Sequence, residues 1–349
     1  MKKSALEEIA HALGASGKGI LAADESGPTI AKRLAAIGVE STPEVNNAYR
    51  DILLTTPGFE KYISGVIFFD ETLRQSTVAG QVPYPTHLSG LGVIPGIKVD
   101  KGAKPLANFQ DEEITEGLDG LRERFGEYYE LGARFAKWRA VLSIQGGAIP
   151  SRTALQVNAY ALARYAALAQ EAGIVPICEP EVLMDGDHSI DRSFEVTEAA
   201  IHALYAALRD QGVALEGTVL KPNMVVSGYD GTNIADTDEI AEKTLACFKR
   251  CVPAAVPSIV FLSGGQSEIE ATTNLDRINK QKAAASAPWN LSFSFGRALQ
   301  QTALKTWGGK PENIPAAQAA FLHRARCSGL STLGEYLESV ENEGPTAQA

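Results

Sequence analysis

The sequence is poor in the residues that build metal centres and disulfide frameworks. Among its 349 residues there are four cysteines and five histidines. The cysteines (Cys178, Cys247, Cys251 and Cys327) form no Cys-x-x-Cys pair, and no histidines follow them at zinc-finger spacing. Cys247 and Cys251 stand one helical turn apart, and we expect them to be buried as small apolar side chains. This usage of cysteine is typical of a reducing compartment.

Long apolar runs and an excess of basic residues are also missing. No stretch approaches the ~18 consecutive apolar residues of a membrane span. Residues 1–8 (MKKSALEE) lack the apolar core of a secretory signal. The net charge of −10 argues against a general nucleic-acid binder. We therefore expect a soluble, cytoplasmic protein with neither a nucleic-acid nor a membrane partner.

The dinucleotide fingerprint G-x-G-x-x-G is absent from every expected turn between a strand and a helix, which weakens the case for an open doubly wound sheet. Eight short apolar segments alternate instead with helical patterns. The expected strands are 20–23, 62–69, 94–99, 135–144, 174–182, 218–220, 258–262 and 291–295. Such alternation over about 300 residues favours a closed parallel barrel.

We predict one α/β domain, a single (β/α)8 TIM-barrel catalytic domain over residues 1–340. An extra helix at about 4–13 precedes the first strand, and a helix at about 315–326 follows the last βα unit. No linker-like stretch interrupts the chain. The polar segment 341–349 is expected to be a flexible tail.

Charged residues and glycines collect at the carboxyl ends of these strands. They are Asp24, Lys98, Lys137 with Arg139, Glu179 with Glu181, Lys221, Ser263-Gly264 and Gly296-Arg297. In a closed barrel those ends share one face, and that face carries the active site. Buried strands are normally rich in Val, Ile and Leu, so packing alone does not explain these charges.

Lys221 closes the expected sixth strand. Pro222 follows at once, which favours an extended lysine and removes one backbone donor. An ammonium at the end of a buried strand is costly to desolvate, so its pKa falls and the neutral amine becomes accessible. Such an amine suits imine formation with a carbonyl substrate. A surface lysine at a strand end is the alternative interpretation.

Two residue pairs would support this chemistry. Lys137 and Arg139 point to the same side of their strand, and so do Glu179 and Glu181. Lys137 would further lower the pKa of the lysine on strand six, and Glu179 could shuttle the protons of imine formation. Asp24 could take a hydroxyl proton as a carbon–carbon bond breaks. Helix capping by Asp24 and structural ion pairs of the glutamates are the alternatives.

Two clusters suit phosphate groups. The turn Ser263-Gly264-Gly265 presents backbone N–H groups at a helix start, and Gly296-Arg297 adds a close backbone approach and a guanidinium. Phosphate sites after strands seven and eight recur in this fold. Lys98, with Lys32 and Arg33 beyond strand one, could hold a second phosphate across the barrel mouth. A basic pocket in an acidic protein indicates a small, strongly anionic substrate.

Eight motifs carry a family resemblance. They are LAADES (21–26), IAKRL (30–34), PGIKVDKG (95–102), FAKWR (135–139), PEVLMDGDH (180–188), LKPNM (220–224), FLSGGQS (261–267) and SFGRALQ (294–300). In this order, across about residues 5–330, they resemble the class I (Schiff-base) fructose-bisphosphate aldolase family. The resemblance implies reversible cleavage of fructose 1,6-bisphosphate to dihydroxyacetone phosphate and glyceraldehyde 3-phosphate, with no metal or other cofactor, by a homotetramer.

The resemblance also implies a role for each site residue. Lys221 would form the imine, Glu179 would act as acid/base with help from Glu181, and Asp24 would act as base towards the C4 hydroxyl. The remaining implied residues are Lys137, Arg139 and Glu25 beside Asp24, Ser263, Gly264, Gly296 and Arg297 at the ketone-side phosphate, and Lys98, Lys32 and Arg33 on the aldehyde-phosphate side.

The chain departs from the family pattern at three places. Gly27-Pro28-Thr29 stands where many members read Thr-Gly-Ser. Phe295 stands where many carry tyrosine, so a hydroxyl on the phosphate side is expected to be missing. Many members end in a catalytically helpful tyrosine, whereas this chain ends Pro345-Thr-Ala-Gln-Ala349. The resemblance therefore assigns no role to the tail.

Three other functions fit the sequence less well. A transaldolase-like Schiff-base enzyme would leave one of the two phosphate clusters idle. A zinc-dependent aldolase would need ligands, but the histidines are scattered and only Asp185-Gly-Asp187-His188 is remotely ligand-like. A barrel that only binds or scaffolds would not need the intact set of Asp24, Lys137, Glu179 and Lys221.

Overall fold

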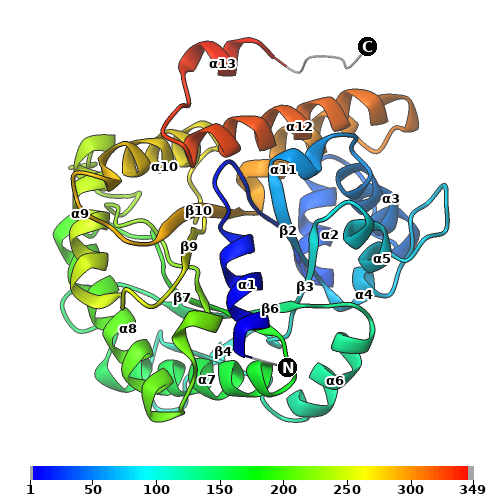
Figure 1. Cartoon of the computed structure of the whole chain (residues 1–349). Helices are drawn as coiled ribbons and strands as arrows, with labels where there is room; N and C mark the ends of the chain where they lie inside the picture. Colours follow the sequence, from blue (N-terminus) through cyan, green and yellow to red (C-terminus); the bar gives the residue numbers. More distant parts are fainter. Residues whose placement is uncertain (1–2, 345–349) are drawn as a thin grey trace.

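A computed structural model describes residues 3–344, with side chains from residue 5 (Figure 1). Eight parallel strands close into a barrel in the order β1-β10-β9-β8-β7-β6-β3-β2. The strands are β1 (Gly19–Ala23), β2 (Ile63–Phe68), β3 (Ile94–Lys98), β6 (Phe135–Leu142), β7 (Val175–Val182), β8 (Val219–Leu220), β9 (Ser258–Phe261) and β10 (Asn290–Phe295). Each predicted strand is present, and the predicted TIM barrel is confirmed.

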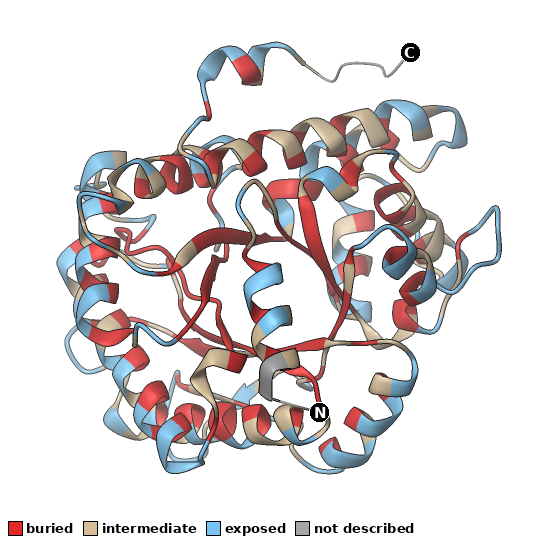
Figure 2. Ribbon diagram, viewed as in Figure 1, coloured by how far each residue is buried: buried red, intermediate tan, exposed pale blue. Residues whose placement is uncertain are grey.

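Helices surround the barrel, and in the ribbon of Figure 2 their buried residues lie mostly on the side towards the strands. They are α1 (Lys3–Leu13), α2 (Gly27–Ala35), α3 (Pro43–Leu54), α4 (Asp70–Leu73), α5 (Tyr84–Gly90), α6 (Leu121–Glu130), α7 (Arg152–Glu171), α8 (Ile190–Asp210), α9 (Thr237–Cys251), α10 (Glu268–Lys282), α11 (Arg297–Trp307), α12 (Ile314–Ser331) and α13 (Glu338–Asn342). Their apolar faces and the outward-facing strand residues form the main core.

A second, smaller core fills the inside of the barrel. It contains inward-facing residues of six strands, such as Ile20, Ile177 and Val219, together with Leu6 and Leu13 of α1. In Figure 1 helix α1 lies across the near end of the barrel. Because α1 covers the amino-terminal end of the strands, the polar residues at their carboxyl ends face the opposite opening.

Strand periodicity decides which charged residues enter that opening. On β7 the inward residues Val175 and Ile177 are followed at the same parity by Glu179 and Glu181. On β8, Val219 is followed in the same way by Lys221. The inward face of β7 and of β8 thus changes from apolar to charged residues along the strand. The apolar residues pack the lower part of the barrel, and the charged residues line the opening above it.

The structure adds elements that the sequence pattern did not predict. Strands β4 (Ala103–Pro105) and β5 (Glu113–Thr115) form an antiparallel hairpin outside the barrel. Helix α8 begins at Ile190, where the hydroxyl of Ser189 accepts a hydrogen bond from the N–H of Arg192. Helix α12 ends at Ser331 rather than 326.

Helix α13 crosses the expected domain boundary at residue 340, since it ends at Asn342. Residues 345–349 lie outside the described part of the chain, so the expected flexible tail stays a prediction. Within residues 3–344, no helix is long and apolar enough to cross a membrane. The four cysteines are buried and free, as expected for Cys247 and Cys251.

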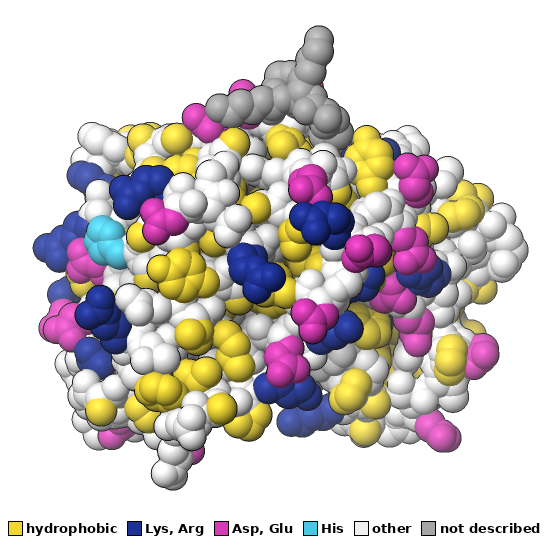
Figure 3. All heavy atoms as spheres, turned by 90° about the horizontal axis from the view of Figure 1, so that it is seen from below, with side chains coloured by type: hydrophobic (Ala, Val, Ile, Leu, Met, Phe, Trp, Pro, Cys, Tyr) yellow, Lys and Arg dark blue, Asp and Glu magenta, His cyan; other side chains and the backbone are white. Residues whose placement is uncertain are grey.

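Charged side chains of both signs are interspersed over the face that Figure 3 shows, with apolar side chains between them. A protein that binds nucleic acid through its surface would present a continuous basic patch. No such patch covers this face.

Candidate active site

The carboxyl ends of the strands enclose a cavity of about 540 Å³. Its lining contains every site residue predicted from the sequence, namely Asp24, Glu25, Lys32, Arg33, Lys98, Lys137, Arg139, Glu179, Glu181, Lys221, Ser263, Gly264, Gly296 and Arg297. Lys32 and Arg33 lie on α2, and the others come from seven of the eight strands or the residues directly after them. The volume lies within the range of about 300–1,000 Å³ that is usual for small-molecule sites.

Lys221 is held at the end of β8 by its own backbone. Its N–H donates to the carbonyl of Cys178 at 2.8 Å, and the carbonyl of Pro222 accepts from Leu262 at 3.0 Å. The residue is 3% exposed, and its Nζ lies 3.0 Å from Oε1 of Glu179. The proline therefore ends the pairing with β7 while the lysine side chain stays inside the barrel.

Lys137 bridges two carboxylates. Its Nζ lies 2.8 Å from Oδ2 of Asp24 and 3.1 Å from Oε2 of Glu179. All three side chains are at most 10% exposed. Together with Lys221 they form a chain of alternating charge, Asp24–Lys137–Glu179–Lys221, across the floor of the cavity.

This arrangement sets the protonation states. Burial lowers the pKa of Lys221; the negative charge of Glu179 opposes that shift, and Lys137 reinforces it. Burial also acts to lower the pKa of Lys137, but Asp24 and Glu179 outweigh it and raise that pKa. For Asp24 and Glu179, burial acts to raise the pKa, yet the surrounding cations bring both below their ordinary values. Of the two buried lysines, Lys221 thus loses its proton more readily than Lys137.

A second ion pair lies nearer the cavity mouth. Nε of Arg139 pairs with Oε2 of Glu181, and this arginine side chain is 40% exposed. The backbone N–H of Arg139 donates to Asp100 at 3.2 Å, and Nζ of Lys98 lies 3.5 Å from the other oxygen of Asp100. Asp100 therefore ties the end of β3 to the end of β6 and holds Lys98 at the rim.

The turn after β9 requires glycine. Gly264 has a φ of +60°, and a Cβ there would lie 2.3 Å from Cε of Met184. At Gly265 the φ is +116°, and a Cβ would lie 3.7 Å from Nη2 of Arg297. The same Cβ would lie closer still, 3.2 Å, to Cε2 of Tyr229, so a side chain at either glycine would crowd the turn beside the Arg297 guanidinium. Both features suit an oxyanion such as phosphate.

Arg33 lines the cavity from α2, beyond β1 as predicted, and its guanidinium extends towards β10. Its Nη2 is 3.9 Å from the position that a Cβ on Gly296 would take, on the side of the cavity that carries Arg297. It reaches this place by pairing with Glu25, which also pairs with Arg50 at 2.9 Å. The Glu25 carboxylate thus directs this guanidinium towards β10, while Lys98 lines the same cavity, and the grouping of Arg33 with Lys98 stays a prediction.

Four residues of the site escaped the sequence analysis. Ser294 lines the cavity, and its buried hydroxyl has no hydrogen-bond partner among the described residues. Gln300 donates to Glu25 at 3.0 Å and to the carbonyl of Ala22 at 2.7 Å. Asp100 and Arg50 are the others. Ser294, Gln300 and Asp100 stand inside motifs that carry the resemblance, so inward parity on the strands could have found Ser294.

The departures from the family pattern have local explanations. Pro28 lies in the first turn of α2, where a missing N–H is tolerated, and the hydroxyls of Thr29 and Ser26 lie 3.1 Å apart. Phe295 points outward into the main core rather than into the cavity. A hydroxyl at that position would therefore not reach the pocket, and the expected loss on the phosphate side does not apply.

The sequence of residues 5–349 matches the family model of glycolytic class I fructose-bisphosphate aldolases. The chain belongs to the class I fructose-bisphosphate aldolase family. This membership confirms the predicted family and its aldehyde-lyase reaction, the reversible aldol cleavage of fructose 1,6-bisphosphate, which the family carries out in glycolysis and gluconeogenesis through a lysine Schiff base.

Individual class I aldolases are similar over nearly the whole chain. A probable class 1 fructose-bisphosphate aldolase of Xylella fastidiosa is 54% identical, with 95% of this chain and 98% of the relative covered. The cytosolic fructose-bisphosphate aldolase 6 of Arabidopsis thaliana is 56% identical, with 96% and 92% covered. A solved structure of fructose-bisphosphate aldolase from Plasmodium falciparum has a TM-score of 0.93 at 47% identity, covering 96% of this chain and 95% of that one.

Proposed function

We propose that Lys221 forms the Schiff base with the ketone of fructose 1,6-bisphosphate, and that Glu179 and Asp24 move the protons of the cleavage. One observation carries this assignment: the 3.0 Å contact between Nζ of Lys221 and Oε1 of Glu179, both 3% exposed, at the floor of a cavity ringed by cations. An amine with a lowered pKa and a carboxylate in contact with it are what imine formation requires.

Imine formation begins with a proton transfer. Glu179 takes a proton from Lys221 across their contact, which leaves a neutral amine. The amine attacks the C2 carbonyl, and a carbinolamine results once an amine proton has moved to the oxygen. Glu179 then returns its proton to that hydroxyl, water leaves, and a protonated imine remains. Lys137, 3.1 Å from Glu179, keeps this carboxylate in place.

Asp24 serves the carbon–carbon cleavage. Its carboxylate is ionised because Lys137 and Lys221 hold its pKa well below the usual range against the effect of burial. It accepts the proton of the C4 hydroxyl while the electrons of the C3–C4 bond move towards the protonated imine. Glyceraldehyde 3-phosphate leaves, and an enamine of dihydroxyacetone phosphate stays on Lys221. Arg139 and Glu181 assist at the mouth of the cavity.

The two phosphates occupy opposite sides of the cavity. We place the ketone-side phosphate on Ser263, Gly264, Gly296 and Arg297, and we add Arg33 to this set because its guanidinium lies beside Gly296. Lys98 and Lys32 remain for the aldehyde-side phosphate. Glu25 acts on this site by directing Arg33. The proposed ligand is a small sugar bisphosphate, and no step uses a metal or other cofactor.

Initial rates on fructose 1,6-bisphosphate and fructose 1-phosphate test these assignments. We expect the bisphosphate to be preferred. Lys98→Ala should lower kcat/KM for the bisphosphate by about 10- to 100-fold, the worth of one charged phosphate contact, and change the monophosphate little. Lys104→Ala, at an exposed lysine of β4, is the matched control. Lys221→Met should abolish both activities; a monophosphate preference or retained cleavage in Lys221→Met would contradict the assignment.

We also propose that the enzyme is a cytoplasmic homotetramer. Relatives from Arabidopsis thaliana and Cicer arietinum are named cytosolic and cytoplasmic aldolases, which supports the compartment. The tetramer follows the family's usual assembly. Light scattering measured as the protein elutes from a size-exclusion column should give a mass about four times the 37.1 kDa of one chain. A monomer at micromolar concentration would contradict this part of the proposal.

A further inference from the structure

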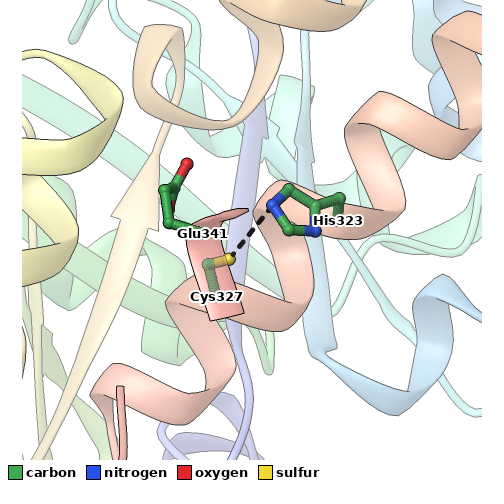
Figure 4. Close-up of side chains that lie close together, drawn as sticks. All are labelled: His323, Cys327 and Glu341. Carbon is green, nitrogen blue, oxygen red and sulfur yellow. Dashed lines mark hydrogen bonds between the residues drawn. The ribbon is translucent and has the colours of Figure 1, made fainter. Parts of the chain in front are cut away.

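Three side chains near the end of the described chain gather outside the barrel cavity. His323 and Cys327 stand one turn apart on α12, and Glu341 reaches them from α13 (Figure 4). One ligand atom of each lies within 4.8 Å of the other two. Among residues 3–344, these three side chains are close enough together to share a metal ion, whereas Asp185, Asp187 and His188 are not.

The geometry matches a particular class of ion. Sγ of Cys327 lies 3.6 Å from Nε2 of His323. Two ligands of a tetrahedral zinc ion, with bonds of about 2.3 Å to sulfur and 2.0–2.1 Å to nitrogen, lie about 3.6 Å apart. The two side chains are thus already spaced as two corners of such a tetrahedral site. A thiolate, an imidazole and a carboxylate together favour zinc over calcium or magnesium.

We propose that His323, Cys327 and Glu341 form a binding site for a divalent ion of the zinc class, which ties α13 to α12. The inference concerns a second site and does not depend on the proposed catalytic roles. Cys327 binds as the thiolate and releases its proton to solvent on binding. Water takes the fourth position, since three protein ligands are present.

The surroundings position the carboxylate. Glu341 pairs through Oε1 with Nη1 of Arg324 and accepts from the hydroxyl of Tyr336 at 2.8 Å through Oε2. A carboxylate has about four lone-pair sites, so it can keep both partners and still bind an ion. Partners of this kind orient metal ligands in known sites. The three ligand atoms lie within 4.8 Å of one another, so the Glu341 carboxylate must move closer on binding, and it is carried by α13, a helix of only five residues.

A small apolar cluster keeps the site together. Cys327 is fully buried and packs with Tyr336 and Val340, apart from the main core. Because these contacts bring α13 against α12 before any ion binds, the ligands are held close together in the unbound chain. A bound ion would add to that contact and stabilise the end of the folded chain.

Cobalt titration tests the site on the full-length, chelator-treated chain. Co²⁺ in a tetrahedral thiolate site gives intense absorption, and we expect one ion per chain. Cys327→Ser and His323→Gln should each weaken binding by about 100-fold or more, beyond the 10–100-fold loss typical of an outer partner. His202→Gln, at an exposed histidine 3.9 Å from a carboxylate, and Cys251→Ser are the matched controls and should bind normally.

Thermal unfolding supplies a second readout. With zinc at about 100 times its Kd, the Tm of a chain of this length should rise by about 4 °C. Cys327→Ser and Glu341→Gln should lose most of this rise. Absence of the cobalt absorption, an equal loss in the controls, or a Tm rise that survives in His323→Gln would overturn the proposal.

Discussion

Replacing Lys137 with methionine tests the charge chain at the floor of the cavity. The methionine is of similar length, so it keeps the packing and removes the charge between Asp24 and Glu179. At an effective dielectric constant near 20, the contacts of 2.8 and 3.1 Å correspond to attractions of about 6 and 5 kcal/mol. The desolvation of three buried groups offsets much of this. Removing one partner of a buried pair typically costs about 3–5 kcal/mol.

We therefore expect Lys137→Met to lower the free energy of unfolding by about 4 kcal/mol at neutral pH, or the Tm by about 5 °C. Lys98→Met is the matched control. Lys98 is 18% exposed and 3.5 Å from Asp100, a carboxylate that keeps its bonds from two backbone N–H groups. Its loss should cost about 1 kcal/mol or less. Urea unfolding of both variants measures the difference.

The pH dependence gives this prediction its sign. Asp24 and Glu179 have lowered pKa values in the folded chain, so their contribution to stability is present above about pH 4 and is lost as the pH falls through the folded values. Lys137 has a raised pKa, so its contribution is complete below 10.5 and is lost only in strong base. Without Lys137, burial favours protonated carboxylates. The loss of unfolding free energy caused by Lys137→Met should thus be smaller near pH 4 than at neutral pH. An equal loss at both pH values would refute the charge chain.

Three further predictions concern other parts of the site. Gly264→Ala would place a Cβ 2.3 Å from Met184 at a positive φ, so kcat/KM should fall at least about tenfold with a lower Tm, whereas Gly90→Ala should change neither; steady-state rates and calorimetry decide this. Gln300→Leu would release Glu25 and so Arg33, raising KM about tenfold with little change in kcat; a change in kcat alone would speak against that role. Chelator should leave cleavage of fructose 1,6-bisphosphate unchanged while it lowers the Tm, and lost activity would contradict the Schiff-base mechanism.

The barrel and its site could be predicted from the sequence for one physical reason. Strands that are buried on both faces appear in the sequence as apolar runs, and charged residues at the ends of such runs are not explained by packing and so indicate a functional site. The fold then brings distant residues to one opening, so Asp24 and Lys221 line the same cavity although 197 positions separate them in the sequence. Inward parity on β7 placed Glu179 and Glu181 correctly without any knowledge of the contacts.

The remaining features depend on contacts that no local pattern encodes. Arg33 sits beside Gly296 because Glu25 directs it there, and Glu25 is itself held by Arg50 and Gln300 from two other helices. The hairpin β4–β5 has strands of three residues each, too short for a periodic signal. Likewise, the cluster around Cys327 joins two helices, and only the packing of α13 on α12 brings its members together.

The imine at Lys221 is tested most directly by trapping it. Borohydride added to the chain with dihydroxyacetone phosphate should reduce the imine to a stable secondary amine, one per chain. Peptide mapping by mass spectrometry should place the added mass on Lys221, and Lys221→Met should carry none. An adduct on Lys137 or elsewhere, or no adduct in an active enzyme, would contradict the assignment of Lys221 as the Schiff-base lysine.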